Sequence, residues 1–415
     1  MNTSTNRVAV VGAGMVGLST AWFLQERGVE VTVYDRSGVA AGSSWGNAGW
    51  LTPGISTPLP EPAVLKYGIR AALSPASPVY VPPSLDRRLL RFLARFTRNS
   101  TMTRWRRAMD ALVPINRLAL ESFDLLTEGG VDASTHATES FIAAYRSEDE
   151  RGALLAEIEH IARAGQQVDY ELLDGDRARA LQPLLSEQVT AGIRLRGQRY
   201  LDPGAFAAAL GEAVESRGAA LDLRAVTAVH DLPRGVQLSH PGEETSGPYD
   251  AVVVATGTWL TDLVAPFGVR ALVQAGRGYS FSVPVAEEMR GPVYFPTQRV
   301  ACTPLGDRLR VAGMMEFRSP DAPLDRRRIE AIVAAARPLP RGIDLDDRRD
   351  EWVGSRPCTA DGLPLIGYTR SPRVLAAGGH GMWGVTLGPA TGRLLAQTIT
   401  EGEPAAALAP FDPLR

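Results

Sequence analysis

The stretch Arg7–Arg27, RVAVVGAGMVGLSTAWFLQER, starts with an apolar run, passes through closely spaced glycines and ends in a pattern of helical spacing. The run Arg7–Val11 is rich in β-branched residues and is typical of a buried parallel strand. Apolar residues at helical spacing follow from Leu18, and Gly28 is placed as a helix C-cap. The next segment, VEVTVY, indicates a second strand, which Asp35 closes. The sequence therefore predicts a strand, a glycine loop, a helix and a second strand.

The glycines of this unit have the spacing G-x-G-x-x-G, which in this context predicts a dinucleotide site. Gly12 permits the tight turn, Gly14 lets the backbone approach a pyrophosphate, and Gly17 lets the helix pack close to the strand. The helix N-terminus offers N–H groups to the phosphates. Asp35 is placed to accept hydrogen bonds from the adenosine ribose. NAD and FAD share this ADP half, whose expected contacts are Gly12, Ala13, Gly14, Met15, Val16, Gly17, Asp35 and Arg36.

Three later segments favour FAD over NAD. Residues 41–50, AGSSWGNAGW, have the composition of a loop that follows a ligand with its backbone, and an apolar strand ends in ATG at 255–257. A third segment, 373–385, again combines a strand, glycines and a helix start, whose dipole would favour negative charge on a reduced isoalloxazine ring. With Val226, the further contacts expected for FAD are Ser43, Ser44, Asn47, Ala48, Gly49, Trp50, Thr256, Gly257, Gly379, Gly381, Met382, Trp383, Gly384 and Val385.

These motifs resemble those of the D-amino-acid dehydrogenase and glycine/D-amino-acid oxidase family of FAD-dependent oxidoreductases. The resemblance is carried, in the family's order, by VVGAGMVGLSTAWFL (10–24), SSWGNAGWLTPG (43–54), LDPGAF (201–206), GRGYSF (276–281), RLRVAGMMEF (308–317), SRPCTADGLPLIG (355–367) and GGHGMWGVTLGPATG (378–392). It covers nearly the whole chain, and the SSWGNAG loop and GHG turn are most similar to the D-amino-acid dehydrogenase branch. The family fold it implies is α/β, with a Rossmann-like FAD-binding domain of discontinuous segments and an α+β substrate domain capping the flavin.

On this resemblance the chain divides into interleaved segments. Residues 1–57, 190–268 and 350–415 are expected to form the FAD-binding domain, and residues 58–189 and 269–349 the substrate-binding domain. Prolines cluster near the first crossing between them and just before the last.

The resemblance implies FAD-dependent oxidation of an amino acid at its α-carbon, by hydride transfer to flavin N5. A D-amino acid would give an imino acid, and then a 2-oxo acid and ammonia. Two alternatives stay open. The substrate could be glycine or a secondary amine such as sarcosine or D-hydroxyproline, or the chain could be the flavin subunit of a hetero-oligomer.

Three residues are candidates for handling the substrate. Arg356, in SRPCTADG, resembles the family's carboxylate-binding arginine, and a guanidinium matches a carboxylate bidentately; a structural salt bridge is the alternative. Tyr279, in RGYS, could add a hydroxyl to the pocket or be an ordinary buried tyrosine. His380 lies beside the flavin turn, where it could hydrogen-bond the substrate or hold the loop, and we favour the loop role.

The composition excludes several classes of protein. A formal charge of −2 gives no reason to expect nucleic acid, and two cysteines and five scattered histidines predict no metal site. A single lysine, Lys66, leaves almost no means of Schiff-base or P-loop chemistry. The lysines with which sarcosine oxidases promote the reaction with oxygen are also missing, which favours a quinone over O2 as electron acceptor. No cysteine aligns with the covalent flavin attachment of those enzymes, so we expect noncovalent FAD.

Residues 85–111 combine leucines and phenylalanines at helical spacing with flanking arginines, which predicts a basic amphipathic helix. Such a helix could lie on an anionic membrane surface or pack on its own domain. The N-terminus is polar, and no apolar run approaches the roughly 18 residues of a membrane span. We therefore expect a cytoplasmic protein, with a peripheral contact at the inner face of the membrane as an option.

Overall fold

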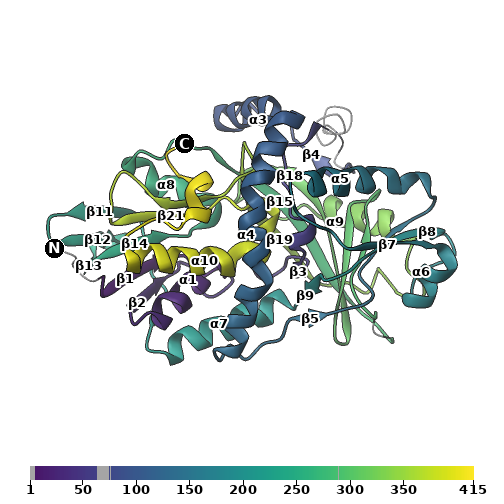
Figure 1. The fold of residues 1–415 in the computed structure, drawn as a ribbon, viewed down its shortest axis with the longest axis horizontal. Helices are drawn as coiled ribbons and strands as arrows, with labels where there is room; N and C mark the ends of the chain where they lie inside the picture. The colour runs from purple at the N-terminus through teal and green to yellow at the C-terminus, as the bar shows by residue number, and fades with distance from the viewer. Residues whose placement is uncertain (1–4, 63–73, 75, 288) are drawn as a thin grey trace.

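Two β-sheets, lying side by side along the long axis of the molecule, organise the fold (Figure 1). The computed structural model describes residues 5–62, 74, 76–287 and 289–415. Lys66, on which the argument about the electron acceptor depends, lies outside the described residues.

The first sheet contains the predicted N-terminal unit. Its order is β10 (Ala220–Asp222), β2 (Glu30–Tyr34), β1 (Arg7–Val11), β14 (Ala251–Val254), β21 (Val374–Gly378) and β20 (Leu365–Tyr368). The strands run parallel except for β20, which is antiparallel to β21. Its central strands β1, β14 and β21 are buried on both faces, which is why they are almost entirely apolar, with valine prominent in β1 and β14. This sheet confirms the predicted Rossmann-like arrangement.

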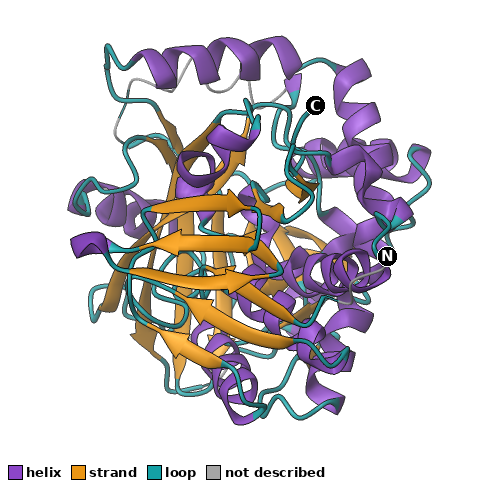
Figure 2. Cartoon of the chain, turned by 90° about the vertical axis from the view of Figure 1, so that its left-hand side faces the viewer, coloured by secondary structure: helices purple, strands orange, loops and turns teal. Residues whose placement is uncertain are grey.

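Different layers cover the two faces of this sheet. Helices α1 (Met15–Glu26), α7 (Pro203–Ser216) and α10 (Gly384–Glu401) pack on one face. The other face packs against α8 (Leu260–Val264) and a small sheet of β11 (Ala228–Leu232), β12 (Gly235–Ser239) and β13 (Thr245–Tyr249). Figure 2 views this end of the molecule, where the long helices gather on one side of the strands. The result is a three-layer unit.

The second sheet has nine strands of mixed direction. Its order is β19 (Arg349–Thr359), β15 (Val273–Pro284), β18 (Arg308–Phe317), β17 (Val300–Leu305), β16 (Val293–Phe295), β6 (Ile142–Tyr145), β8 (Ala191–Leu195) and β7 (Tyr170–Asp174), with β4 (Val79–Tyr80) beside β18. Helix α9 (Arg326–Ala336) packs on one face, and α6 (Gly175–Leu181) lies at the β7 end. Helices α3 (Arg87–Asn99), α4 (Met102–Glu128) and α5 (Gly152–Arg163) cover the opposite face. Strands β3 (Trp50–Leu51), β9 (Arg199–Tyr200) and β5 (His136–Ala137) form a short connecting sheet.

The expected division into domains differs from the sheet pairing at two boundaries. Strand β8 follows residue 190 and β19 starts at residue 349, so both were expected in the FAD-binding domain, yet both pair within the second sheet. Helix α4, expected in the substrate-binding domain, packs against α10 and runs between the two sheets in Figure 1. Prolines mark where the chain turns, but hydrogen-bond partners decide sheet membership. The division itself stays a prediction.

The segment 85–111 was expected as one helix and is two. Helix α3 ends before Ser100, whose hydroxyl donates back to the carbonyl of Phe96, and α4 begins after Thr101, whose side chain accepts the N–H of Arg104. Short hydroxyl side chains of this kind compete with helix continuation and favour caps.

The apolar stripe of α3 faces the protein itself. Leu89, Phe92 and Phe96 are buried against Met315 and Phe317 of β18. The arginines of α3 are exposed, as are two leucines, Leu85 and Leu90. No described helix combines the length and the apolar character that a transmembrane span requires.

Candidate active site

The glycine loop joins β1 to α1 in a geometry that only glycine permits. Gly12 has φ of +117°, and a Cβ there would lie 2.4 Å from the carbonyl oxygen of Ala255. A Cβ on Gly17 would lie 1.8 Å from the carbonyl oxygen of Gly12, so α1 could not approach β1 with any other residue. Helix α1 starts after Gly14 without a side-chain cap. Apart from the N–H of Met15, which the hydroxyl of Ser44 accepts, the first main-chain N–H groups of α1 can face an anion.

Asp35 lies at the end of β2 and fixes this loop. Its Oδ2 accepts the N–H of Ala13 at 2.8 Å, and its Oδ1 accepts the N–H of Ser37 at 2.8 Å. The next residue, Arg36, places its guanidinium 4.0 Å from the ring centroid of Trp259. The carboxylate thus orients the main chain of the glycine loop, and its contact with the ribose stays a prediction.

The loop at 43–50 is bound to α1. The hydroxyl oxygen of Ser44 accepts the N–H of Met15 at 3.0 Å, and the amide of Asn47 donates to the carbonyl of Ser44 at 2.8 Å. The side-chain oxygen of Asn47 accepts the N–H of Gly49 at 2.7 Å. These bonds hold the main chain of the loop beside the start of α1.

The same loop is also bound to the second sheet. The Thr303 hydroxyl donates to the carbonyl of Ala48 at 2.6 Å and accepts Nε1–H of Trp50 at 2.8 Å. The Ser43 hydroxyl donates to the carbonyl of Ser355 on β19 at 2.5 Å. The loop therefore lies between the two sheets.

The segment after β14 adds an unpartnered polar atom to this region. Oγ1 of Thr256 is buried and has no hydrogen-bond partner among the described residues. Gly257 follows with φ of +59° and opens a short 3₁₀ turn. Val226 packs on the apolar cluster that includes Tyr34 and Val254, at the same end of the first sheet.

The turn after β21 completes the set of expected cofactor segments. Gly379 and Gly381 adopt φ of +80° and +58°, and α10 starts without a side-chain cap. Nε1–H of Trp383 donates to the carbonyl of Thr57 at 2.7 Å, and the Thr386 hydroxyl donates to the carbonyl of Trp50 at 3.0 Å. Met382 is exposed, whereas Gly384 and Val385 are half-buried. The chain around the 43–50 loop is therefore in contact with the turn after β21 and the start of α10.

These features fit FAD. Two helix N-termini lack side-chain caps, at α1 and α10, and can face negative charge at two separate places. Thr256 offers a buried hydroxyl that lacks a partner among the described residues. A ligand as long as FAD would pass from the α1 loop to the α10 turn.

Arg356 lies on β19, and its guanidinium lies over Gly278 of the neighbouring strand β15. A Cβ on Gly278 would lie 2.2 Å from Nη2 of Arg356. Nη1 donates to the carbonyl of Met314 at 2.8 Å and lies 3.8 Å from the sulfur of Met315. No carboxylate among the described residues pairs with Arg356, and burial lowers its pKa from the ordinary value. An arginine stays protonated at neutral pH, so this site carries an uncompensated positive charge.

His380 is buried at the start of the α10 turn. Its Nε2 shares a hydrogen bond of 2.9 Å with the hydroxyl of Thr391 inside α10, and its main chain forms a bridge with Cys358. Burial lowers the pKa of His380 to about 4, so the ring is neutral. The ring thus holds the turn to the helix, and a contact with substrate stays a prediction.

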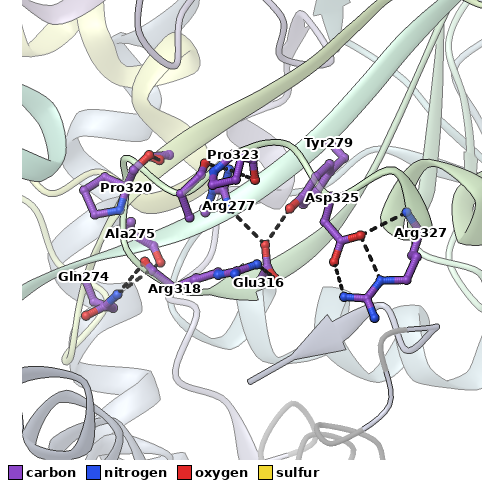
Figure 3. A network of polar contacts seen from close by, with 12 residues as sticks. Gln274, Ala275, Arg277, Tyr279, Glu316, Arg318, Pro320, Pro323, Asp325 and Arg327 are labelled. Carbon is purple, nitrogen blue, oxygen red and sulfur yellow. Dashed lines mark hydrogen bonds and ion pairs between the residues drawn. The ribbon is translucent and has the colours of Figure 1, made fainter. Parts of the chain in front are cut away.

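Tyr279 requires a correction, because it lies on the opposite face of the second sheet from Arg356. Its hydroxyl donates to Glu316 at 2.5 Å in the network of Figure 3, where Arg277 also approaches that carboxylate at 3.3 Å. Side chains alternate along a strand, so Tyr279 points away from the face that Gly278 shares with Arg356. Burial and the bond to Glu316 raise the pKa of Tyr279. The structure does not bring Tyr279 into the candidate site.

Two further residues belong to the site although sequence motifs gave no signal for them. Thr57 lines a small pocket together with Cys358, His380 and Trp383. Trp352 covers the 43–50 loop, since a Cβ on Gly46 would lie 2.3 Å from its ring. Burial raises the pKa of the Cys358 thiol to about 12, so it is a neutral lining group.

The fold and this site together define an FAD-dependent oxidoreductase. Residues 7–398 match the model of the family described as FAD dependent oxidoreductase, and the chain belongs to that family. The cofactor is therefore FAD, as the glycine loop and the three later segments predicted.

Curated relatives cover almost the whole chain. A D-amino acid dehydrogenase of Cereibacter sphaeroides is 34% identical over 407 residues, which are 95% of this chain and 91% of the relative. One from Azorhizobium caulinodans is 30% identical over 417 residues, 96% and 97% of the two chains.

Solved structures share the fold. Glycine oxidase from Geobacillus kaustophilus superposes with a TM-score of 0.72 at 24% identity, covering 99% of both chains. The FAD-bound L-alpha-glycerophosphate oxidase from Mycoplasma pneumoniae has a TM-score of 0.73 at 16% identity, covering 96% of this chain and 95% of the other. At these identities the likeness concerns the fold alone.

Proposed function

We propose that this enzyme oxidises a D-amino acid at its α-carbon and that Arg356 binds the substrate carboxylate. The supporting observation is the guanidinium of Arg356, which is desolvated, points to the face that carries the flavin loops and has no carboxylate partner among the described residues. The D-amino acid dehydrogenases that resemble the chain at 30–34% identity support the same class of substrate.

The chain's own residues bind and orient the substrate. Bound FAD supplies the hydride acceptor, at N5, that the oxidation requires. Arg356 holds the carboxylate in a bidentate contact and so fixes the direction of the Cα–H bond. The amine has to be neutral when the hydride leaves, and the imino acid then reacts with water to give a 2-oxo acid and ammonia. No acid–base triad is needed for these steps, and the N-terminus of α10 stabilises negative charge at its end of the site.

Anaerobic reduction of the flavin, followed near 450 nm, tests the proposal directly. The panel contains D-amino acids, their L-enantiomers, glycine, sarcosine and D-hydroxyproline. We expect D-amino acids to bleach the flavin and the L-enantiomers to leave it oxidised. Bleaching by L-amino acids alone, or by secondary amines alone, would contradict the assignment. Because the proposed binding is noncovalent, we expect denaturation to release intact FAD from the chain.

We further propose a quinone as the electron acceptor, reached from the cytoplasmic face of a membrane through α3. The exposed Leu85 and Leu90 and the exposed arginines of α3 support a peripheral contact, although most of the apolar stripe is buried. Reduced enzyme should be reoxidised faster by a soluble quinone analogue than by air. Co-sedimentation with anionic vesicles at low salt, lost in the double variant Leu85→Ser/Leu90→Ser, tests the contact.

A further inference from the structure

A second group of polar side chains converges beside the proposed substrate site. It comes from five separate places in the chain: a loop, α5, β6, β16 and the turn after β16. We call it the Glu61–Glu157 cluster; its members are Glu61, Glu157, Tyr145, Tyr294 and Arg299. The site described above uses none of them.

Short contacts join the Glu61–Glu157 cluster to the flavin segments. The Thr57 hydroxyl donates to Oε1 of Glu157 at 3.0 Å, and the Thr57 carbonyl accepts Nε1–H of Trp383. The ring of Tyr294 lies 5.4 Å from the ring of Trp50, in the 43–50 loop. The cluster is therefore one residue away from both the flavin loop and the α10 turn.

The cluster also adjoins Arg356. Tyr145 and Tyr294 pack in the apolar cluster beneath α4 and α5. Cys358, two residues after Arg356 on β19, packs beneath α3. These helices cover the same face of the second sheet, so the carboxylate anchor and the cluster share that face.

The Glu61–Glu157 cluster has polar groups that nothing in the described chain satisfies. The hydroxyl of Tyr145 has no hydrogen-bond partner although the residue is only 2% exposed, and the charged groups nearest to it include Glu157 and Arg299. Such an orphaned buried hydroxyl is costly unless a ligand or water completes it.

The charges of the cluster are unbalanced as well. Arg299 interacts electrostatically with Tyr294 and forms no ion pair with either glutamate, so two carboxylates share one guanidinium. Burial and the neighbouring charge of Glu61 raise the pKa of Glu157 to about 7, and burial also raises the pKa of Glu61. The nearby His160 and Arg299 oppose this effect only in part. A bound cation would favour ionisation of both carboxylates.

We propose that the Glu61–Glu157 cluster binds a cationic group, an ammonium or a guanidinium, on the side chain of the substrate. This inference rests on the proposed function, since Arg356 must hold the carboxylate at the other end. The two glutamates accept hydrogen bonds from the cation, and the hydroxyl of Tyr145 adds a further acceptor. The preferred substrate is then a basic D-amino acid.

The test compares cationic substrates with neutral substrates of similar shape. Anaerobic reduction of the FAD-loaded enzyme is measured with D-arginine against D-citrulline and with D-lysine against D-norleucine. We expect kcat/KM to be at least about tenfold higher for the cationic member of each pair, because hydrogen bonds between charged groups are the strong ones. Flavin reduction without this preference overturns the inference and leaves the proposed function intact, whereas no reduction by any D-amino acid overturns both.

Two variants test whether the Glu61–Glu157 cluster causes the preference for cationic substrates. Glu157→Gln should lower kcat/KM for D-arginine at least about tenfold more than for D-alanine, and Glu61→Gln provides the same test from another segment should the first variant fold poorly. Glu159→Gln, an exposed neighbour on α5, is the matched control and should keep the preference. An equal loss for all substrates in both cluster variants would indicate a role toward the amine common to them, and would overturn the inference.

Discussion

The two faces of strands β15 and β19 carry two arginines, the buried Arg277 and the half-buried Arg356, whose charges are balanced to different degrees. On one face Arg277, 1% exposed in its side chain, approaches Glu316 at 3.3 Å and donates to the carbonyl of Pro323 at 3.1 Å. On the other face Arg356 has a single main-chain acceptor and no carboxylate among the described residues. A charge removed from water is stabilised when an opposite charge pairs with it. Although Nε of Arg277 and Oε1 of Glu316 have no hydrogen-bond partner among the described residues, the charges on the first face are balanced, and we call it the complete face. The charge on the second face is not balanced, and we call it the incomplete face. The incomplete face is where we place the substrate.

The largest effect on the free energy of unfolding should come from removing the counter-charge of Arg277 on the complete face. Glu316→Gln leaves Arg277 buried without its counter-charge, and we expect a loss of about 3–5 kcal/mol in the free energy of unfolding. Urea denaturation measures it. Glu330→Gln on α9 removes an exposed ion pair with Arg348 and should cost less than about 1 kcal/mol. Similar values for the two variants would remove the contrast between the faces.

Removing the guanidinium from the incomplete face should affect binding instead of folding. Arg356→Ala should raise KM for the best D-amino acid about a hundredfold or more, since a desolvated charged contact contributes roughly 1.5–3 kcal/mol or more. The melting temperature should fall only slightly, because the variant loses the hydrogen bond to the carbonyl of Met314 but leaves no carboxylate without its counter-charge. Unchanged KM in a flavin-loaded variant would exclude Arg356 as the anchor.

The pH dependence of the free energy of unfolding tests whether His380, which lies beside the incomplete face, has a structural role. Its pKa is about 4 in the folded protein against about 6.5 when unfolded, so the unfolded chain takes up the proton first as the pH falls. Stability from this group is complete above about pH 6.5 and declines toward pH 4. We expect wild type to lose about 2 kcal/mol more than His380→Asn between pH 6.5 and 5. Parallel curves for the two proteins would contradict the assignment.

The smallest expected effect separates Tyr279 from substrate binding. Tyr279→Phe deletes the buried hydrogen bond to Glu316 and should lower the free energy of unfolding by about 1 kcal/mol. KM should stay within about twofold of wild type, because the hydroxyl lies on the complete face. A tenfold rise in KM without loss of stability would return Tyr279 to the substrate site.

Local sequence predicted the parts of the fold that depend on neighbouring residues. The glycine loop, its flanking strands and the helix after it follow from spacing and steric need, and all are confirmed. The face on which Tyr279 lies could not be predicted, because nearly every residue of β15 is buried and no apolar–polar alternation marks its sides. The Glu61–Glu157 cluster could not be predicted from the sequence either, since only the packing of distant segments brings its members together.

The order of the strands has a consequence for the newly made protein. Strand β14 pairs with β1 on one side and with β21 on the other, and Thr386 of α10 closes on Trp50. A nascent chain therefore lacks part of the cofactor site until residues 374–401 have been synthesised. We therefore expect FAD to bind only a chain that already contains these residues, and prematurely terminated copies to stay flavin-free and open to proteolysis.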